Sequence, residues 1–350
     1  MNPDFWKNRS VFLTGHTGFK GGWTALLLSQ MGANVFGYSL APPTTPSFFV
    51  ETKLETHLSN SKIANILDLK TLIQEMNAAK PSIVIHMAAQ PLVRKSYTMP
   101  VDTFTTNVIG TVNTLEAARQ SETVKAVIIV TSDKCYKNHE QIIPYRENDQ
   151  LGGHDPYSSS KACAELVTEA YQKSFYIDLG LQLASVRAGN VIGGGDWAAD
   201  RLIPDFFRAL DVGETLQVRS PNAIRPWQHV LEPVFGYLAL AEKLVVNDSS
   251  YSEAWNFGPE KEDNKAVSWI VERLCNKISG SKWELIGTPH LHEAGLLNLD
   301  ISKSKSRLNW SPRWDLTKAL DMTIDWHQAW KQGKSMKEIS INQIKSYIAI

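Results

Sequence analysis

The stretch SVFLTGHTGFKGGW, residues 10–23, joins a short apolar run to a glycine-rich turn and then to a helical pattern. Its glycines Gly15, Gly18 and Gly21 are spaced G-x-x-G-x-x-G. Such a turn needs glycine because the backbone must bend tightly, approach a ligand and let a helix pack against a strand. The free N–H groups at the start of that helix favour an anion. The stretch therefore predicts a strand, turn and helix that bind the pyrophosphate of a dinucleotide, with Phe19 in the binding turn.

Short runs rich in β-branched residues alternate with helical patterns after this stretch. The runs are nearly continuous in apolar residues, as expected for strands that are covered on both faces. This alternation predicts βαβ units and an α/β fold with a doubly wound parallel (Rossmann) sheet. The expected strands are 10–14, 34–39, 63–67, 82–87, 125–131 and 181–187, and the expected helices between them are 21–31, 69–79, 101–121 and 156–176.

The pattern changes after about residue 188, where Gly and Pro cluster and the strands become scattered. We therefore expect a cofactor-binding Rossmann domain over residues 1–187 and a smaller α/β substrate-binding portion over 188–350, interleaved with the first. The last twenty residues, from Lys331, have the periodicity of a terminal helix. Further helices are expected near 203–212, 230–246, 264–278, 303–308 and 316–331.

The bulk composition argues against several classes of protein. The 350 residues are 43% hydrophobic, which supports a sizeable core. Lys plus Arg and Asp plus Glu both number 36, so nothing in the charge balance favours nucleic acid or an anionic membrane as partner. The three cysteines are far apart and predict neither a disulfide framework nor a metal site. Without a signal-peptide region or an apolar segment of about 18 residues, we expect a soluble, cytoplasmic protein.

Two polar stretches follow the fifth expected strand. The first, VTSDKCY at 130–136, places Ser132, Asp133 and Lys134 in a row at the strand end. Because parallel sheets bind ligands at the carboxyl ends of their strands, these side chains are candidates for catalysis.

The second stretch, HDPYSSSKACAE at 154–165, opens a helix on which Tyr157 and Lys161 share one face. A tyrosine of unperturbed pKa about 10 is a poor base at neutral pH. A nearby ammonium and a cationic nicotinamide ring would lower that pKa. The pair therefore predicts a Tyr–Lys acid–base unit.

Together these motifs resemble the extended short-chain dehydrogenase/reductase superfamily, the NAD-dependent epimerases and dehydratases, over residues 5–330. The Asp133–Lys134 pair resembles the nucleotide-sugar 4,6-dehydratases, in which a Glu usually stands where this chain has Lys134. The stretches GHTGFKGGW, TSDKCY and RPWQHV are most similar to the dehydratases that act on CDP-D-glucose. The resemblance implies NAD as cofactor and hydride transfer within one sugar, from C4 to C6.

The resemblance also implies cofactor-binding residues beyond the glycine turn. Asp68 would end the third strand and hold the adenine, and Ala88 and Ala89 would line the cofactor at the end of the fourth. Asn107 would lie in the next helix, and Tyr157 and Lys161 would also contact the cofactor. One departure concerns the end of the second strand, where Ser39 stands in place of the acid that binds the ribose in NAD enzymes.

For the substrate, the resemblance places Asn190 beside the sugar nucleotide and Arg201 at the border of the nucleobase. Arg225 would hold the diphosphate, because a guanidinium makes paired hydrogen bonds to phosphate oxygens. Arg219 is a further candidate for that role.

The implied mechanism assigns Tyr157 to the 4-hydroxyl proton, Ser132 to a hydrogen bond with that hydroxyl, and Asp133 to loss of the 6-hydroxyl as water. Lys134 would act as the C5 base, act through water, or hold Asp133. The implied protein is a homo-oligomer, a dimer or tetramer, that supplies deoxysugar for surface polysaccharide such as the O-antigen of lipopolysaccharide. Two alternatives remain: a nucleotide-sugar 4-epimerase, which would not need Asp133, and a non-catalytic NAD-binding regulator, which would need only the cofactor end.

Overall fold

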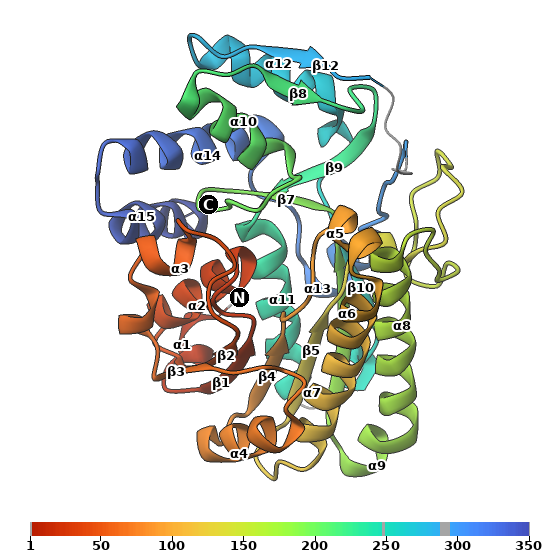
Figure 1. The fold of residues 1–350 in the computed structure, drawn as a ribbon. Coiled ribbons are helices and arrows are strands. Elements are labelled where there is room, and N and C mark those ends of the chain that lie inside the picture. The colour runs from red at the N-terminus through yellow and green to blue at the C-terminus, as the bar shows by residue number, and fades with distance from the viewer. Residues whose placement is uncertain (1, 247–248, 288–294, 350) are drawn as a thin grey trace.

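The computed structural model describes residues 2–246, 249–287 and 295–349, and its centre is a sheet of seven parallel strands (Figure 1). The strand order is β3-β2-β1-β4-β5-β6-β10, so the chain starts in the middle, runs to one edge and then crosses to the other. This doubly wound order confirms the predicted fold class. The strands are β1 Ser10–Thr14, β2 Asn34–Ser39, β3 Asn60–Ile63, β4 Ile83–His86, β5 Ala126–Val130, β6 Gln182–Ala188 and β10 Ala254–Phe257.

Helices cover both faces of the sheet, because successive strand residues point to opposite sides. Val11 and Leu13 of β1 belong to a core that includes residues of α2 and α11. Phe12, between them, belongs to a second core with residues of α4 and α7. Burial on both faces explains why these strands are apolar without alternation. The covering helices are α2 Phe19–Gln30, α4 Leu69–Ala79, α7 Gly110–Arg119, α8 Pro156–Tyr171 and α11 Leu231–Val245.

A smaller part of the protein lies beyond the carboxyl ends of these strands (Figure 1). It contains a three-stranded sheet, β11-β9-β7, and a two-stranded sheet of β8 and β12, which share a separate hydrophobic core with three helices. These elements are β7 Asn190–Ile192, α10 Leu202–Val212, β8 Leu216–Val218, β9 Ile224–His229, β11 Asn264–Ala266, α12 Val267–Lys277, β12 Trp283–Leu285 and α14 Leu316–Lys331.

The two parts are interleaved along the chain. After β9, helix α11 returns to the large sheet, and β10 then pairs with β6 at its edge. Helix α13, Ser302–Leu308, packs against β10, and the terminal helix α15, Met336–Ile348, packs against α2 and α14. Residues on both sides of position 188 therefore contribute strands to the large sheet.

Two elements differ from the expectation. The third strand covers 60–63 rather than 63–67, because those are the residues that pair with β2. Ile66 instead lies in the loop after β3, where its buried side chain faces Gly110. The apolar residues of this loop give the sequence a pattern that resembles a strand. The single helix expected over 101–121 consists of three pieces: α6 Pro100–Phe104, a π-helical turn Thr105–Ile109, and α7.

The remaining elements are short. They are the helices α1 Pro3–Trp6, α3 Phe48–Glu51, α5 Val93–Thr98 and α9 Ile177–Leu179, a π-helical turn Gln172–Tyr176, and 3₁₀ turns Leu54–His57, Asp133–Cys135, Ser249–Tyr251 and Lys261–Asp263. Among the described residues, no helix combines the length and the apolar character that crossing a membrane requires.

Candidate active site

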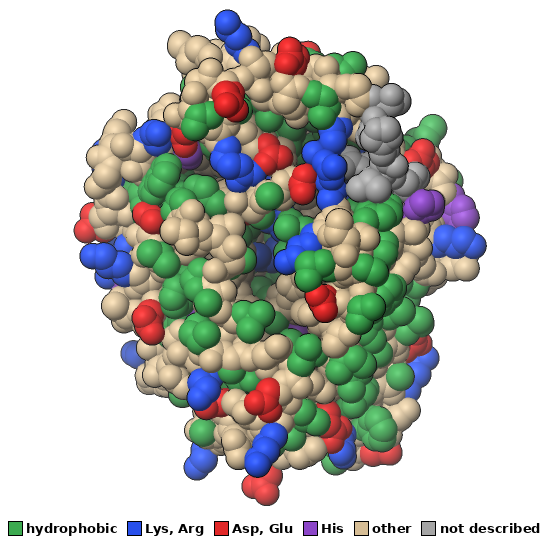
Figure 2. Space-filling view, viewed as in Figure 1, with side chains coloured by type: hydrophobic (Ala, Val, Ile, Leu, Met, Phe, Trp, Pro, Cys, Tyr) green, Lys and Arg blue, Asp and Glu red, His purple; other side chains and the backbone are tan. Residues whose placement is uncertain are grey.

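A large cleft separates the carboxyl ends of the seven-stranded sheet from the smaller part of the protein, and the space-filling view shows it as a hollow with charged side chains at its rim (Figure 2). Its volume is about 1610 Å³. A pocket for a single small ligand usually measures about 300–1,000 Å³. The cleft therefore has room for two ligands side by side.

The glycine turn forms one wall of the cleft. Gly15 has φ +79°, and a Cβ there would lie 2.7 Å from the backbone nitrogen of Ala88. A Cβ on Gly21 would lie 2.1 Å from the carbonyl oxygen of Gly15, so these two glycines let β1, β4 and α2 approach closely. Gly18 is the N-cap of α2 and supplies no capping side chain, while Phe19 opens the helix and lines the cleft. The first N–H groups of α2 are thus available to an anion.

The same wall continues along the ends of β2 and β4. Ser39 lines the cleft and exchanges a hydrogen bond of 2.8 Å with the hydroxyl of Thr17. Ala88 and Ala89 line it as predicted. Asn65, just after β3, also lines it and was missed in the sequence, although it is the first polar residue after that strand in an otherwise apolar run.

The prediction that Asp68 ends the third strand is wrong. Asp68 is exposed, caps α4, and accepts hydrogen bonds from the N–H and the hydroxyl of Thr71 at 3.1 and 2.6 Å. These bonds lower the pKa of its carboxyl. Its side chain is not among those that line the cleft, because the strand ends five residues earlier and the chain turns into α4.

Asn107 also lies outside the lining of the cleft, contrary to the cofactor contact that was expected. Its buried amide accepts a hydrogen bond from the N–H of Gln90 at 2.8 Å and donates to the hydroxyl of Ser160, also at 2.8 Å. It therefore ties the end of β4 to α8 and acts on the site through its neighbours.

Three candidate catalytic residues follow β5 and line the cleft, as predicted. Ser132 is the N-cap of the 3₁₀ turn, and its hydroxyl donates to Oδ1 of Asp133 at 2.9 Å. The same hydroxyl accepts the backbone N–H of Lys134 at 3.2 Å. The turn thus fixes all three residues at the strand end.

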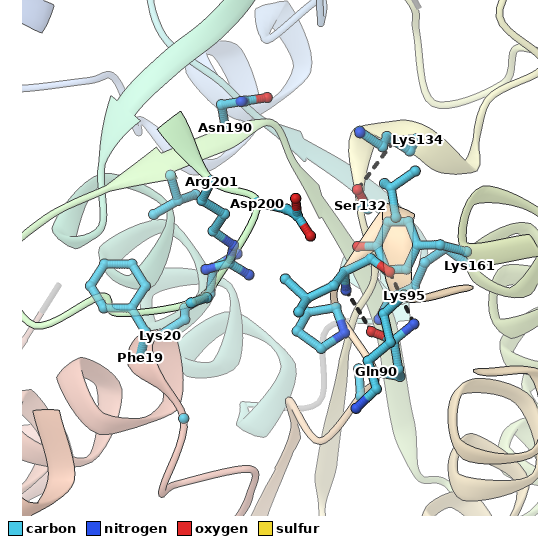
Figure 3. Close-up of a pocket in the computed structure, with 18 of the residues that line it drawn as sticks. Phe19, Lys20, Gln90, Lys95, Ser132, Lys134, Lys161, Asn190, Asp200 and Arg201 are labelled. Atoms are coloured by element: carbon cyan, nitrogen blue, oxygen red, sulfur yellow. Dashed lines mark hydrogen bonds between the residues drawn. The ribbon is translucent and has the colours of Figure 1, made fainter. Parts of the chain in front are cut away.

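The other two candidates, Tyr157 and Lys161, lie on α8 and line the cleft. Figure 3 shows Lys161 on the same side of the cleft as Ser132 and Lys134. The helix begins because Asp155 caps it and Pro156 occupies its first position. The backbone N–H of Tyr157 donates to the hydroxyl of Ser96 at 3.1 Å, and Nζ of Lys161 donates to the carbonyl at the end of β5 at 3.2 Å. The structure therefore brings all five predicted catalytic residues into one cleft.

Burial controls the protonation of the Tyr–Lys unit. It raises the pKa of Tyr157 to about 12, although a hydrogen bond with Ser132 opposes this. It lowers the pKa of Lys161 to about 8, while the carboxylate of Glu165 opposes that shift. Burial thus favours the neutral form of both groups, and an added positive charge near Tyr157 would favour its phenolate.

Asp133 has the properties of a general acid. Burial raises the pKa of its carboxyl, against the opposing charge of Lys134 and the bond from Ser132. Its Oδ2 atom is buried and has no hydrogen-bond partner among the described residues. Gly189 lies beside that oxygen, and a Cβ there would lie 3.2 Å from it and 2.4 Å from the ring of Pro226, so the site requires glycine at this position.

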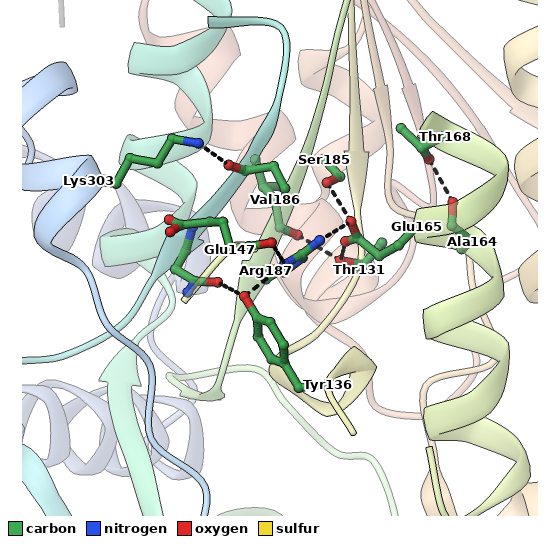
Figure 4. A network of polar contacts seen from close by, with 12 residues as sticks. Thr131, Tyr136, Glu147, Ala164, Glu165, Thr168, Ser185, Val186, Arg187 and Lys303 are labelled. Atoms are coloured by element: carbon green, nitrogen blue, oxygen red, sulfur yellow. Dashed lines mark hydrogen bonds and ion pairs between the residues drawn. The ribbon is translucent and has the colours of Figure 1, made fainter. Parts of the chain in front are cut away.

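A buried polar network lies directly behind these residues (Figure 4). Glu165 and Arg187 form an ion pair of 2.7 Å, and Glu165 also accepts the hydroxyls of Thr131 and Ser185. Arg187 donates to the hydroxyl of Tyr136 at 2.8 Å. Burial alone would raise the pKa of Glu165, but Arg187 and the hydroxyls hold it below its usual value. Sequence reasoning missed this network, although Glu165 follows Lys161 by one helical turn.

The four predicted substrate-binding residues all line the cleft. Asn190 begins β7, and Arg201 is the N-cap of α10, where it pairs with Asp196 at 2.8 Å. Arg219 follows β8 and approaches Asp200 at 3.4 Å. All four belong to the part of the chain after residue 188.

Arg225 lies in β9 and is only 8% exposed. Its Nη1 donates to the carbonyl of Ile224 at 2.9 Å and to that of Gly295 at 3.3 Å. These bonds hold the guanidinium at the cleft.

Sequence reasoning also missed cationic residues of the cleft, among them Lys20. Lys20, the second residue of α2, lines the cleft. Burial, together with the charges of Lys161 and Arg201, lowers its pKa to about 7. The sequence signal for this cation was the presence of a lysine between Gly18 and Gly21 of the glycine turn.

Comparison with known proteins agrees with this geometry. The family model described as GDP-mannose 4,6 dehydratase matches residues 12–323. The chain is 49% identical to the CDP-glucose 4,6-dehydratase of Salmonella typhimurium over 355 residues, which cover all of this chain and 99% of that protein. Its sequence resemblance to the epimerase/dehydratase superfamily is thereby confirmed.

Solved structures share the fold at lower identity. The epimerase Mth375 of Methanothermobacter thermautotrophicus superposes with a TM-score of 0.79 at 21% identity, over 94% of this chain and 95% of that one. The dTDP-glucose 4,6-dehydratase DesIV of Streptomyces venezuelae, in a double mutant with NAD and DAU bound, also gives 0.79 at 21% identity, over 93% and 98%. Sequence and fold agree, and the chain belongs to the GDP-mannose 4,6-dehydratase family.

Proposed function

We propose that the protein is an NAD-dependent hydro-lyase that converts CDP-D-glucose to CDP-4-keto-6-deoxy-D-glucose. The observation that carries the proposal is the pair Asp133 and Lys134 beside Ser132, in a cleft that also holds Tyr157 and Lys161. Oxidation at a sugar carbon needs a Tyr–Lys unit, whereas loss of water needs an additional acid. The 49% identity with a CDP-glucose 4,6-dehydratase over the full chain supports the choice of sugar nucleotide.

The residues of the glycine wall fit NAD. The turn packs through glycines that leave no space for a Cβ, and the uncapped start of α2 faces the cleft. Ser39 offers a hydroxyl, and no carboxylate, at the end of β2. Bound NAD would supply a hydride acceptor that can return the hydride to the same sugar.

In the first step, Tyr157 takes the proton of the 4-hydroxyl while Ser132 hydrogen-bonds to that hydroxyl. The protonated Lys161 stabilises the phenolate, and its bond to the end of β5 keeps the ammonium in place. Because burial raises the pKa of Tyr157 to about 12, a positive charge such as the ammonium of Lys161 is needed for Tyr157 to act as a base.

In the second step, Asp133 protonates the departing 6-hydroxyl. Its raised pKa favours the protonated form, and its buried Oδ2 is the atom with no other partner among the described residues. Removal of the C5 proton falls to Lys134, directly or through water, or to a water molecule while Lys134 holds Asp133. The hydride for C6 would come from the bound cofactor, and return of a proton to C5 would complete the product.

We assign binding of the sugar nucleotide to the part after residue 188. Arg225 and Arg219 supply guanidinium groups for the diphosphate, Arg201 at the start of α10 borders the nucleobase, and Asn190 contacts the sugar nucleotide. We further propose that the enzyme is cytoplasmic, forms a dimer or tetramer, and supplies deoxysugar for surface polysaccharide such as O-antigen.

Labelled substrate tests the proposal. With deuterium at C4 of CDP-glucose, the product should weigh one water less and carry the deuterium in its methyl group, without crossing between substrate molecules. In heavy water, C5 should gain solvent deuterium. A 4-epimerase would return the label to C4 and form no methyl group, and a regulator would give no turnover, so either result would refute the dehydratase assignment.

A further inference from the structure

An ion pair connects the two parts of the protein across the cleft. Arg94 belongs to α5, the helix that follows β4, whereas Asp200 belongs to the segment just before α10. Nη1 of Arg94 lies 3.4 Å from Oδ1 of Asp200, and both residues line the cleft. Figure 3 shows the carboxylate of Asp200 between the side chains of Arg201 and Lys95. Because the cleft separates the large sheet from the smaller part, this pair joins one to the other.

The segment that carries Asp200 is fixed to its own part of the protein. Asp200 has φ +60°, a left-handed conformation that aspartate tolerates better than most residues. Its neighbour Arg201 pairs with Asp196 at 2.8 Å, and Arg208 donates to the carbonyl of Trp197 at 2.9 Å. These contacts hold the chain around Asp200, so its carboxylate extends from a fixed base.

The helix that carries Arg94 is tied to the proposed catalytic tyrosine. Two residues after Arg94, the hydroxyl of Ser96 accepts the backbone N–H of Tyr157 at 3.1 Å. Helix α5 also packs against α8, the helix on which Tyr157 lies. The ion pair therefore connects the surroundings of Tyr157 with the segment next to Arg201, which we assigned to the nucleobase.

We propose that Arg94 and Asp200 are positioning residues that keep sugar nucleotide and cofactor together in the cleft until dehydration is complete, an inference that rests on the proposed function. Oxidation at C4 leaves CDP-4-keto-glucose and reduced cofactor side by side. Escape of either one would end the turnover, because C6 would then receive no hydride. By opposing separation of the two parts, the pair prevents this escape without touching a reacting atom.

A rival interpretation is that Asp200 only competes with the substrate. Arg219, assigned above to the diphosphate, lies 3.4 Å from the same carboxylate oxygen of Asp200. If competition were its whole effect, Asp200→Asn would bind CDP more tightly and would complete as many turnovers as wild type.

The share of turnovers that end in free CDP-4-keto-glucose tests the proposal. Mass spectrometry of the sugar nucleotides and the absorbance of reduced cofactor measure it during multiple turnover with CDP-glucose. The side chains of Arg94 and Asp200 are 40 and 37% exposed, and ion pairs of this kind are weak, so the variants should fold. The share should rise about 2- to 5-fold in Arg94→Gln and in Asp200→Asn.

Two further variants show whether the contact itself is responsible. The double variant Arg94→Gln/Asp200→Asn should release no more ketone than either single variant, because both remove the same contact. Arg94→Lys keeps the positive charge and should fall between wild type and Arg94→Gln.

Arg146→Gln is the matched control. Its ion pair with Asp300, at 3.0 Å, also joins a residue before position 188 to one after it, but neither residue is among those that line the cleft. This variant should release no more ketone than wild type.

The proposal would be overturned by an unchanged share in Arg94→Gln, by additive effects in the double variant, or by an equal rise in Arg146→Gln. Tighter binding of CDP as the sole effect of Asp200→Asn would overturn it in favour of competition. If Asp200→Asn did not fold, Arg94→Gln and Arg94→Lys would decide the question. Formation of neither free ketone nor dehydrated product by wild type would instead refute the proposed function.

Discussion

Asp133 and Tyr157 divide the proposed chemistry between two side chains, so substitutions at these positions should stop different steps. In Asp133→Asn the amide keeps the shape of the carboxyl but cannot donate its proton. Elimination should slow by about 10²- to 10⁴-fold. Oxidation at C4 should suffer less, so rapid-quench analysis of a single turnover should reveal accumulated CDP-4-keto-glucose.

Tyr157→Phe is the companion variant. It lacks the group that takes the 4-hydroxyl proton, so C4 oxidation itself should be lost and no ketone should form. Equal loss of C4 oxidation in both variants, with no intermediate in either, would contradict the division of roles.

At the scale of single residues, the sequence was informative where a short segment fixes both the backbone and the side chain. The glycine turn and Tyr157–Lys161 are of this kind, because a turn or one helix face determines where they lie. Lys20 was not recognised, since its environment depends on Arg201 and Asp133, which are distant in the chain.

The variant Asp68→Ala tests whether Asp68 caps α4 or contacts the cofactor. Because its carboxylate caps α4 through Thr71, Asp68→Ala should lower the free energy of unfolding. Its side chain is absent from the cleft lining, so the dissociation constant of NAD should not change. Urea denaturation and NAD titration measure the two effects. A large loss of NAD affinity in Asp68→Ala would instead support the predicted contact between Asp68 and the adenine.

The Glu165–Arg187 pair joins α8 to β6 behind the catalytic residues. Glu165→Gln leaves the buried guanidinium without its counter-charge, which should cost about 3–5 kcal/mol of unfolding free energy. Arg187→Gln should cost a similar amount.

The double variant Glu165→Gln/Arg187→Gln removes both charges and should lose less than the sum of the two single variants. Urea denaturation of all four proteins gives the coupling energy. Strict additivity would mean that the two side chains act independently.

At the scale of elements, local patterns predicted the strands and helices of the first half well. The position of β3 was wrong because the apolar residue Ile66 packs from a loop. The return of β10 to the edge of the large sheet was not foreseen, because its pairing with β6 joins residues about seventy positions apart, Ala254 with Ser185. Pairing at such distances depends on tertiary packing, which a local pattern does not report.

At the scale of the whole molecule, the cleft depends on two parts of the chain. The glycine turn, which forms one wall, follows the first strand of the large sheet. Arg201, Arg219 and Arg225, which also line the cleft, belong to the later elements. Because α11 packs on the large sheet, β10 pairs with its edge strand and α15 packs on α2, these elements anchor the second part to the first. This interleaving explains how two walls distant in sequence can position two ligands against each other.

An apolar surface beside the cleft bears on the proposed oligomer. Figure 2 shows apolar side chains gathered over the region that α6, α7 and α8 occupy in Figure 1. We call this the α6–α8 patch and define it by Val101, Phe104, Ile109 and Leu166, which are 74, 38, 47 and 55% exposed. Contiguous apolar patches are uncommon on monomers, and helices of one chain can cover those of an identical partner. The patch therefore fits a second copy of this chain.

Leu166→Glu tests that interface. Leu166 is 55% exposed in the single chain, so the substitution should change the stability of a monomer by less than about 0.5 kcal/mol. In a symmetric dimer it would bury two carboxylates against apolar surface, which is strongly unfavourable. Sedimentation velocity should therefore show an oligomer for wild type and a smaller species for Leu166→Glu. Val212→Glu, at an apolar position that is 69% exposed at the end of α10, is the control and should leave the oligomer intact. A monomeric wild type, or an oligomer that survives Leu166→Glu unchanged, would exclude this surface as the interface.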